Sequence, residues 1–273
     1  MPAAAHTVTA RQTAADTLLP VDATLWAVLA VLLLAAAGVA ALAHLTDREG
    51  RRYPRAIAVA GLRAAVQLAA VSFLIGWVVR AIPLLLSFLV MMFAVAVRTA
   101  GRRITANRTW WWASVPIGAG VLPVVAALVL TGLVPLKGIA LIPVTGILIG
   151  GALTATVLAG RRSLDELRLR HGEVEAALAL GLLERDARLE IARPAASEAL
   201  IPGHDQTRTV GLVTLPGAFV GMLLGGAPPV QAGAVQLFVL VALMAVQAVA
   251  TALALELVAR GLLHRGGVDD IAR

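Results

Sequence analysis

Long uncharged stretches constrain the fold of this chain more than any other feature. The longest runs from Thr209 to Leu255, which is 47 residues without Asp, Glu, Lys or Arg. At about 1.5 Å per residue such a stretch would form a helix of roughly 70 Å, whereas a membrane-spanning helix needs only about 20 apolar residues. The stretch therefore holds two spans, and the sequence from Gly225 to Pro229, Gly-Gly-Ala-Pro-Pro, divides them.

The composition agrees with a membrane protein built from helices. Of the 273 residues, 59% are hydrophobic and 14% are charged, whereas a soluble domain carries about 25% charge. In lipid every backbone polar group must be paired within the protein, which favours helices. Aromatic residues make up only 4% of the chain, which favours tightly packed helices over a β-barrel. Cysteine is absent, so disulfides and thiolate metal ligands are excluded.

The predicted fold class is an all-α polytopic membrane protein with about seven transmembrane helices. The expected spans are Ala23–Ala43, 56–79, 81–97, a stretch within 110–136, Gly138–Gly160, and the two halves of the long uncharged run. The spans occupy a transmembrane domain of residues 23–260. Residues 1–22 are expected to form a flexible extracytoplasmic lead, and residues 261–273 a cytoplasmic tail.

The positions of the basic residues predict the orientation of these spans. When residues 161–208 are placed in the cytoplasm and the sides alternate, nineteen basic residues lie inside and three lie outside. Cytoplasmic loops are enriched in Lys and Arg, so the N-terminus is expected outside and the C-terminus inside. The net charge of +7 is then a topology signal, and nucleic acid is not an expected partner.

The predicted cytoplasmic loop, residues 161–208, contains apolar residues at helical spacing. Gly172 is expected to separate two helical pieces, Gly181 to end the second, and Pro194 to end the next. A helix here would suit docking onto a partner protein. The alternative is an amphipathic helix on lipid headgroups, which the acidic residues Glu173 and Glu175 disfavour.

The loop also resembles a known signature. The signature's residues and spacing are those of the EAA motif by which ABC-transporter permeases dock onto their ATPase: Glu175, Ala176, Ala177, Gly181, Ile191 and Pro194. Residues 62–68, 142–150, 172–181 and 205–217 are similar to the family of bacterial iron-export permeases and plant aluminium-tolerance membrane subunits. The chain departs from this family at Gly151, where Asn is common, and at 218–222, which reads Ala-Phe-Val-Gly-Met where the family often has several methionines and a glutamine.

The resemblance implies a permease subunit of an ABC transporter in the inner or plasma membrane. Two copies would pair with two copies of a separate ATPase, which would bind ATP and Mg²⁺, so no cofactor and no catalytic residue is expected on this chain. The ATPase-coupling residues would be Glu173, Glu175, Ala176, Ala177, Gly181, Ile191 and Pro194. The family implies export of an iron-like metal ion, but the residues leave a small metabolite and the direction of transport open. A secondary transporter or a membrane scaffold remains the alternative.

Polar residues within the expected spans are candidates for a solute pathway. Arg63 and Gln67 lie four apart on one helix face, and an ionisable residue inside a span is a functional hypothesis. Arg63 could instead extend its side chain to the nearby interface. Asp205 is expected to cap the sixth span; metal binding with His204 is the alternative. No cluster of metal-ligand type is present in the sequence.

Glycines and prolines within the spans indicate close packing and kinks. Gly146 and Gly150 lie four apart, as do Gly217 and Gly221, and this spacing lets two helices approach within a subunit or across a homodimer. The same glycines could instead form a wall of the pathway. Pro143 and Pro216 are expected to kink the fifth and sixth spans, which could carry movement of the loop into the membrane.

Overall fold

The computed structural model describes residues 22–46, 52–133 and 138–266. In these residues the regular elements are helices, apart from two isolated bridges, and the chain divides into two units at residues 77 and 78. Six of the described helices are long and apolar enough to cross a membrane, which confirms the all-α polytopic class. The predicted lead lies outside the described residues except for Asp22, and the predicted tail is described only to Gly266.

The first unit contains two long helices, α2 (Ala23–Leu42) and most of α3 (Tyr53–Val78). Asp22 caps α2 by accepting a hydrogen bond from the Leu25 amide at 3.1 Å. A Cβ on Gly61 of α3 would lie 2.7 Å from Leu33 Cδ1 of α2, so the glycine permits close contact between the two helices. These helices confirm the first two predicted spans.

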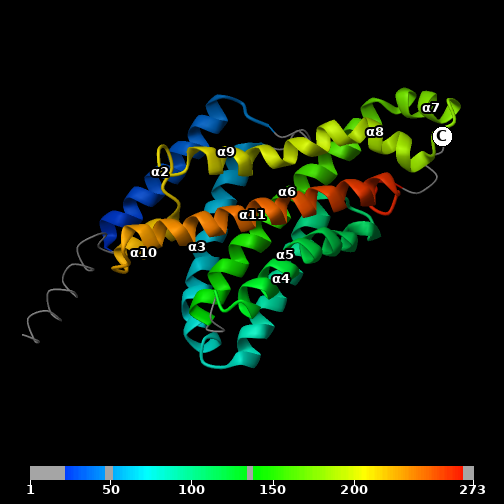
Figure 1. The fold of residues 1–273 in the computed structure, drawn as a ribbon. Coiled ribbons are helices and arrows are strands. Elements are labelled where there is room, and N and C mark those ends of the chain that lie inside the picture. The colour runs from blue at the N-terminus through cyan, green and yellow to red at the C-terminus, as the bar shows by residue number, and fades with distance from the viewer. Residues whose placement is uncertain (1–21, 47–51, 134–137, 267–273) are drawn as a thin grey trace, which may run out of the picture. The chain divides into compact units, whose positions relative to one another are not determined.

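The second unit holds the remaining elements (Figure 1). In chain order they are α4 (Ile82–Ile104), η1 (Arg108–Ala113), α5 (Ser114–Leu130), α6 (Gly138–Leu169), α7 (His171–Ala179), α8 (Glu184–Ser197), η2 (Glu198–Leu200), α9 (Ile201–Thr209), α10 (Gly217–Leu224) and α11 (Pro229–Ala259).

Helices α6 and α11 form the centre of the second unit and pack closely along each other. A Cβ on Gly151 of α6 would overlap Leu243 Cδ1 of α11. Further along, Ala159 of α6 and Ala254 of α11 are fully buried in one cluster. Small side chains at these points let the two helix backbones approach closely. In lipid, where burial of apolar surface does not drive helices together, such close packing is a main source of their association.

The structure corrects the predicted sixth span. Helix α9 ends at Thr209, and residues 210–225 contain only the eight-residue helix α10, preceded by a tight turn. In that turn the Thr209 carbonyl accepts hydrogen bonds from the amides of Val213 at 2.9 Å and Thr214 at 3.2 Å, and Gly211 has φ +83°. The left-handed conformation of Gly211 and the proline at position 216 both interrupt a helix. The uncharged stretch therefore does not begin with a membrane-spanning helix.

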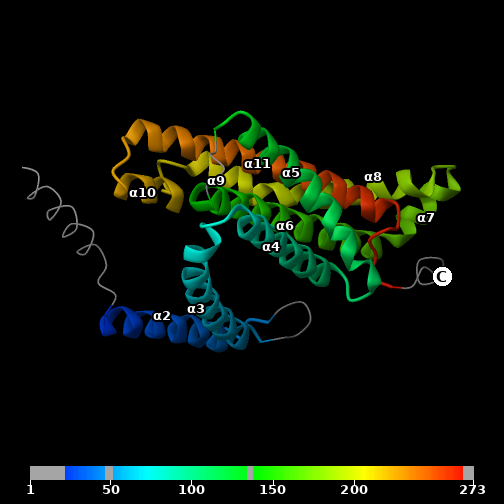
Figure 2. The same ribbon diagram turned by 90° about the horizontal axis from the view of Figure 1, so that it is seen from below.

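The segment from α8 to α10 instead runs along α11 in the opposite direction. Leu189 of α8 lies in a cluster with Ala259 near the end of α11. Gly203 of α9 faces Gln247, and Phe219 of α10 lies 4.0 Å from the Cβ position of Gly233. Figures 1 and 2 both show this antiparallel course. We refer to residues 184–224, from the start of α8 to the end of α10, as the return path. It consists of several short helices rather than one, and it begins earlier in the sequence than the predicted sixth span.

Candidate functional site

The hairpin formed by α7 and α8 contains the EAA-like residues. Helix α6 ends at Leu169 and α7 begins at His171, so the break falls at Arg170 rather than at the predicted Gly172, which lies inside α7. The guanidinium of Arg170 bridges the break, because it pairs with Glu166 on α6 and Glu173 on α7.

Gly181 ends α7 as predicted. Its φ is +92°, a conformation that glycine adopts without steric cost. The Gly181 amide donates to the Leu178 carbonyl at 2.9 Å, and the Leu182 amide donates to the Ala177 carbonyl at 3.1 Å. These two bonds form a Schellman motif, which fixes the direction in which the chain leaves α7.

A small apolar core holds the two helices of the hairpin together. Val174, Ala187 and Ile191 are buried against one another, and Ala177 packs against them. Of the predicted coupling residues, Ala177 and Ile191 thus face the interior of the hairpin, where they set its shape. Pro194 is exposed and lies inside α8, which continues to Ser197, so the helix predicted to end near Pro194 ends three residues later.

Four leucines at the turn of the hairpin are exposed. Leu180 is 82% exposed and Leu183 72%, with Leu178 and Leu182 at 40% each. Glu175 and Ala176 are exposed beside them on α7. We refer to Leu178, Leu180, Leu182 and Leu183 as the leucine tip. An apolar group of this kind on a rigid hairpin is typical of a protein-interaction site.

The acidic residues of α7 have partners within the chain. Arg170 donates hydrogen bonds to Glu173, and these bonds lower the pKa of the Glu173 carboxyl below its usual range. Glu175 lies 3.4 Å from His171 Nδ1. Glu173 therefore rests in a local ion pair and Glu175 lies beside a histidine, and a partner would have to share or displace these contacts.

The hairpin is also tied to the end of α11. The guanidinium of Arg185 on α8 donates two hydrogen bonds to Glu256, with Nε at 2.7 Å and Nη2 at 2.8 Å. Arg260 holds the same carboxylate at 2.5 Å. A bidentate pair fixes orientation as well as distance, so α8 and the end of α11 are positioned as one piece.

The predicted pathway residues are divided between the two units of the chain. Arg63 and Gln67 are exposed on α3 in the first unit. Pro143 lies exposed inside α6, and Pro216 immediately precedes α10. Asp205 lies inside α9 and not at a helix N-cap, because the helix begins four residues earlier than the predicted span.

The predicted glycine pairs do not form the tight contacts of the second unit. Gly146 faces the Met92 methyl group, with Cβ to Cε at 3.1 Å, but Cβ atoms on Gly150, Gly217 or Gly221 would meet no described atom within 4 Å. Pairing of those three with a second copy stays a prediction. The close contact of α6 with α11 uses Gly151 instead, one residue further along.

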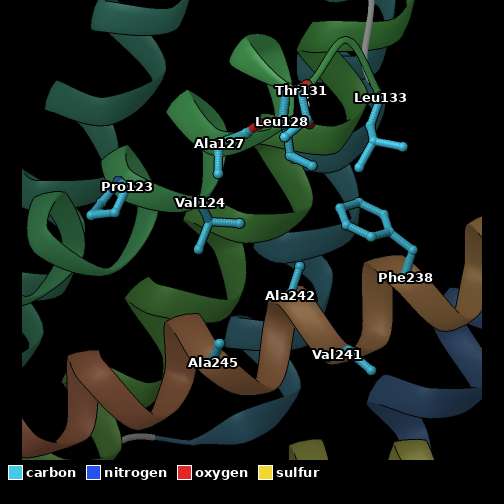
Figure 3. Close-up of a pocket in the computed structure, with 10 residues that line it drawn as sticks. All are labelled: Pro123, Val124, Ala127, Leu128, Thr131, Leu133, Phe238, Val241, Ala242 and Ala245. Carbon is cyan, nitrogen blue, oxygen red and sulfur yellow. Dashed lines mark hydrogen bonds between the residues drawn. The ribbon is translucent and has the colours of Figure 1, made fainter.

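A groove between α5 and α11 has a volume of about 370 Å³ (Figure 3). Figure 3 shows Val124 on α5 and Ala242 on α11 at its opposite walls. The Thr131 hydroxyl in its lining donates to the Ala127 carbonyl at 2.7 Å. The groove thus presents an apolar surface between two spans. Among the described residues no group of three or more His, Asp or Glu side chains could hold a metal ion.

Comparison with known proteins places this architecture in a family. Residues 25–263 match the model of a family described as "Uncharacterised protein family (UPF0014)". The chain belongs to the UPF0014 family.

UPF0014 relatives come from plants and bacteria. The chain is 35% identical to the UPF0014 membrane protein STAR2 of Oryza sativa subsp. japonica over 195 residues, which are 70% of this chain and 68% of that protein. It is 36% identical to Protein ALUMINUM SENSITIVE 3 of Arabidopsis thaliana over 60% of this chain and 58% of that protein. It is 31% identical to the Probable iron export permease protein FetB of Escherichia coli (strain K12), over 54% of this chain and 56% of that protein. No solved structure matches the chain.

The UPF0014 match confirms the family that the sequence resembles and its place in a membrane. Sequence reasoning missed two residues in the matched region that determine helix contacts, Gly151 and Gly203. Gly151 directly follows Gly150, but neither Gly151 nor Gly203 has another glycine four residues away, so a search for four-residue repeats did not select them. It also missed Gln236 and Gln247, which are buried at 5% and 9% exposure on α11; two amides in an otherwise apolar helix were the available signal.

Proposed function

We propose that this chain is the membrane-spanning subunit of an ABC transporter, and that the leucine tip docks onto a separate ATPase. The observation that carries the proposal is the tip itself, four exposed leucines on a hairpin with a defined turn. The EAA-like spacing of Glu175, Ala177 and Gly181 agrees with it.

The hairpin is built to transmit movement. It connects α6 with the α8–α10 path, and its core and the Arg185–Glu256 pair make it rigid relative to α11. A displacement of the tip would therefore move α8 and the end of α11 together. Helix α11 is one of the two central helices, and alternating access to a membrane site requires such helices to move against one another.

The other parts of the proposal, which concern the ATPase, the second copy and the solute, rest on the similarity to permeases. ATP and Mg²⁺ bind the ATPase, and this chain carries no cofactor. Two copies of the chain form the transmembrane pathway in the inner or plasma membrane. The name of the FetB relative, an iron export permease, supports export, with an iron-like metal ion or a small metabolite as the solute.

The proposal is tested by co-purification from native membranes. The tagged chain is compared with a Leu180→Arg variant, and the eluate is assayed for Mg²⁺-dependent ATP hydrolysis and for a protein with a nucleotide-binding motif. Leu180 is 82% exposed, so the change leaves the fold intact while placing a charge in an apolar contact. We expect at least a tenfold loss of the ATPase, which corresponds to about 1.4 kcal/mol.

Glu190→Arg is the matched control, because Glu190 is 72% exposed on α8 beyond the tip. It should retain the ATPase at the level of the unchanged chain. An ATPase that co-purifies equally with Leu180→Arg would contradict docking at the tip. No ATPase in any sample would favour a secondary transporter or a scaffold.

A further inference from the structure

Helix α9 lies against the middle of α11. A Cβ on Gly203 would overlap Gln247 Oε1, and Gln247 stands close to the midpoint of α11 (Pro229–Ala259). Because α11 is long and apolar enough to cross the membrane, this contact puts α9 near the mid-depth of the bilayer.

The outer face of α9 is polar. Only Gly203 is buried against the unit, while His204, Asp205, Gln206 and Arg208 are exposed. Ionisable side chains at the depth of the hydrocarbon are costly unless they face water or a polar partner. Within the part of the chain that the structure describes, no ion pair reaches Asp205 or Arg208.

Two threonines of α9 use their hydroxyl groups for hydrogen bonds to the backbone of the same helix. The Thr207 hydroxyl donates to the Gly203 carbonyl, and the Thr209 hydroxyl donates to the Asp205 carbonyl, both at 2.9 Å. Their donors are thus satisfied within the helix. His204, Asp205 and Gln206 are the side chains left to contact a solute.

A cavity of about 170 Å³ adjoins the end of α9. Its lining is apolar, with Leu215, Phe219, Leu237 and Leu240 among its members, apart from Gln236 of α11, which is the one polar side chain in it. Gln236 is 5% exposed, and its Oε1 has no hydrogen-bond partner among the described residues. A buried amide oxygen without a partner is destabilising, and the cavity has room for a water molecule beside Gln236 that would satisfy it.

We propose that the polar face of α9 and the Gln236 cavity line an aqueous solute route, and that Asp205 and His204 contact a divalent cation in it. The proposal rests on the proposed transport function. Water along this route would hydrate the Asp205 carboxylate and hydrogen-bond the Gln236 side-chain amide oxygen, which has no partner among the described residues. Lipid could do neither.

The donor atoms determine the class of solute. Carboxylate and imidazole together bind divalent first-row transition metals. One copy supplies a single carboxylate and a single imidazole here, and the described residues contain no group of three such ligands. A second copy facing the first would provide two of each, so the site is complete only in the dimer.

The route is tested by thiol labelling, since the natural chain has no cysteine. Single variants Asp205→Cys, His204→Cys and Gln206→Cys are exposed in sealed vesicles to a charged, membrane-impermeant methanethiosulfonate reagent. A thiol reacts as the thiolate, which forms in water and not in lipid. We expect labelling at all three positions and none at Leu122→Cys, a control 66% exposed on α5.

Labelling of well-folded Gln206→Cys decides the outcome if the other two variants are lost during purification. Failure to label any of the three α9 positions, with the reagent active on detergent-solubilised protein, overturns the route. The experiment requires no ATPase, so it can succeed or fail independently of docking at the leucine tip.

The cation assignment is tested with Mn²⁺ alone, whose binding to the purified chain is followed by electron paramagnetic resonance. Asp205→Asn should weaken binding at least tenfold. Glu190→Gln, a charge-matched change at an exposed position of α8, should leave it unchanged. Equal Mn²⁺ affinity in the Asp205→Asn variant and the unchanged chain, or no Mn²⁺ binding by the unchanged chain, overturns the assignment.

Discussion

Gly101 determines how closely the end of α4 approaches η1. A Cβ at this position would overlap the carbonyl oxygen of Trp110, a backbone atom that cannot rotate away as the end of a side chain can. Nearby, Asn107 donates a hydrogen bond to the His264 carbonyl at 2.8 Å. The glycine thus lets α4, η1 and the segment after α11 meet.

We expect Gly101→Ala to destabilise the protein by about 1–3 kcal/mol, the usual cost of overpacking. Gly150→Ala is the matched control, because its added Cβ would meet no described atom within 4 Å and alanine favours a helix by about 0.5–1 kcal/mol. Thermal unfolding in detergent measures both. A Gly101→Ala variant as stable as the Gly150→Ala variant would contradict the close approach to Trp110.

Among the elements, the α7–α8 hairpin depends on one turn residue. Gly181→Ala should destabilise the turn by about 1–2 kcal/mol, the cost of a left-handed residue with a Cβ, because φ at Gly181 is +92°. The expected result is faster amide hydrogen exchange in α7. Gly172→Ala is the control, since it lies inside α7 with open space around it and should slow exchange or leave it unchanged. Equal exchange in the two variants would show that the turn tolerates a side chain.

The sequence predicted this hairpin better than the path that follows it. Gly181 adopts a positive φ that favours glycine whatever the surrounding packing, so its role at the end of the helix was predictable from the sequence. Pro194 and Asp205 were misplaced because tertiary packing extended the helix: Ala192 and Ala196 are fully buried against α6 and α11, which stabilises α8 through the proline. Asp205 then falls inside α9 and not at its start.

At the scale of the whole molecule, apolar length and composition predicted a membrane protein with seven spans, and the described residues contain six of them; the family match agrees with the membrane setting. The broken return path was not predictable in this way. Its helical part, α8 to α9, contains charged residues such as Arg193 and Glu198, so it lacks the apolar signature of a span. Contacts with α6 and α11, rather than its own composition, position it.

The return path predicts that the two turns that bound it lie on opposite sides of the membrane. Ala176 lies beside the leucine tip, and Ala227 lies in the turn between α10 and α11. Because α8 to α10 runs antiparallel to α11 along its length, one crossing should separate these residues. This crossing would also restore seven passes and keep the predicted N-terminus outside and C-terminus inside.

Single Ala176→Cys and Ala227→Cys variants test the crossing in sealed vesicles of known orientation, without interference from native thiols. With an impermeant reagent, we expect Ala176→Cys to react only in inverted vesicles, since nineteen basic residues place its side in the cytoplasm. Ala227→Cys should react only in right-side-out vesicles. Reaction of both variants in the same vesicles would mean that α8 to α10 returns to the side where it began, and the chain would then cross the membrane six times.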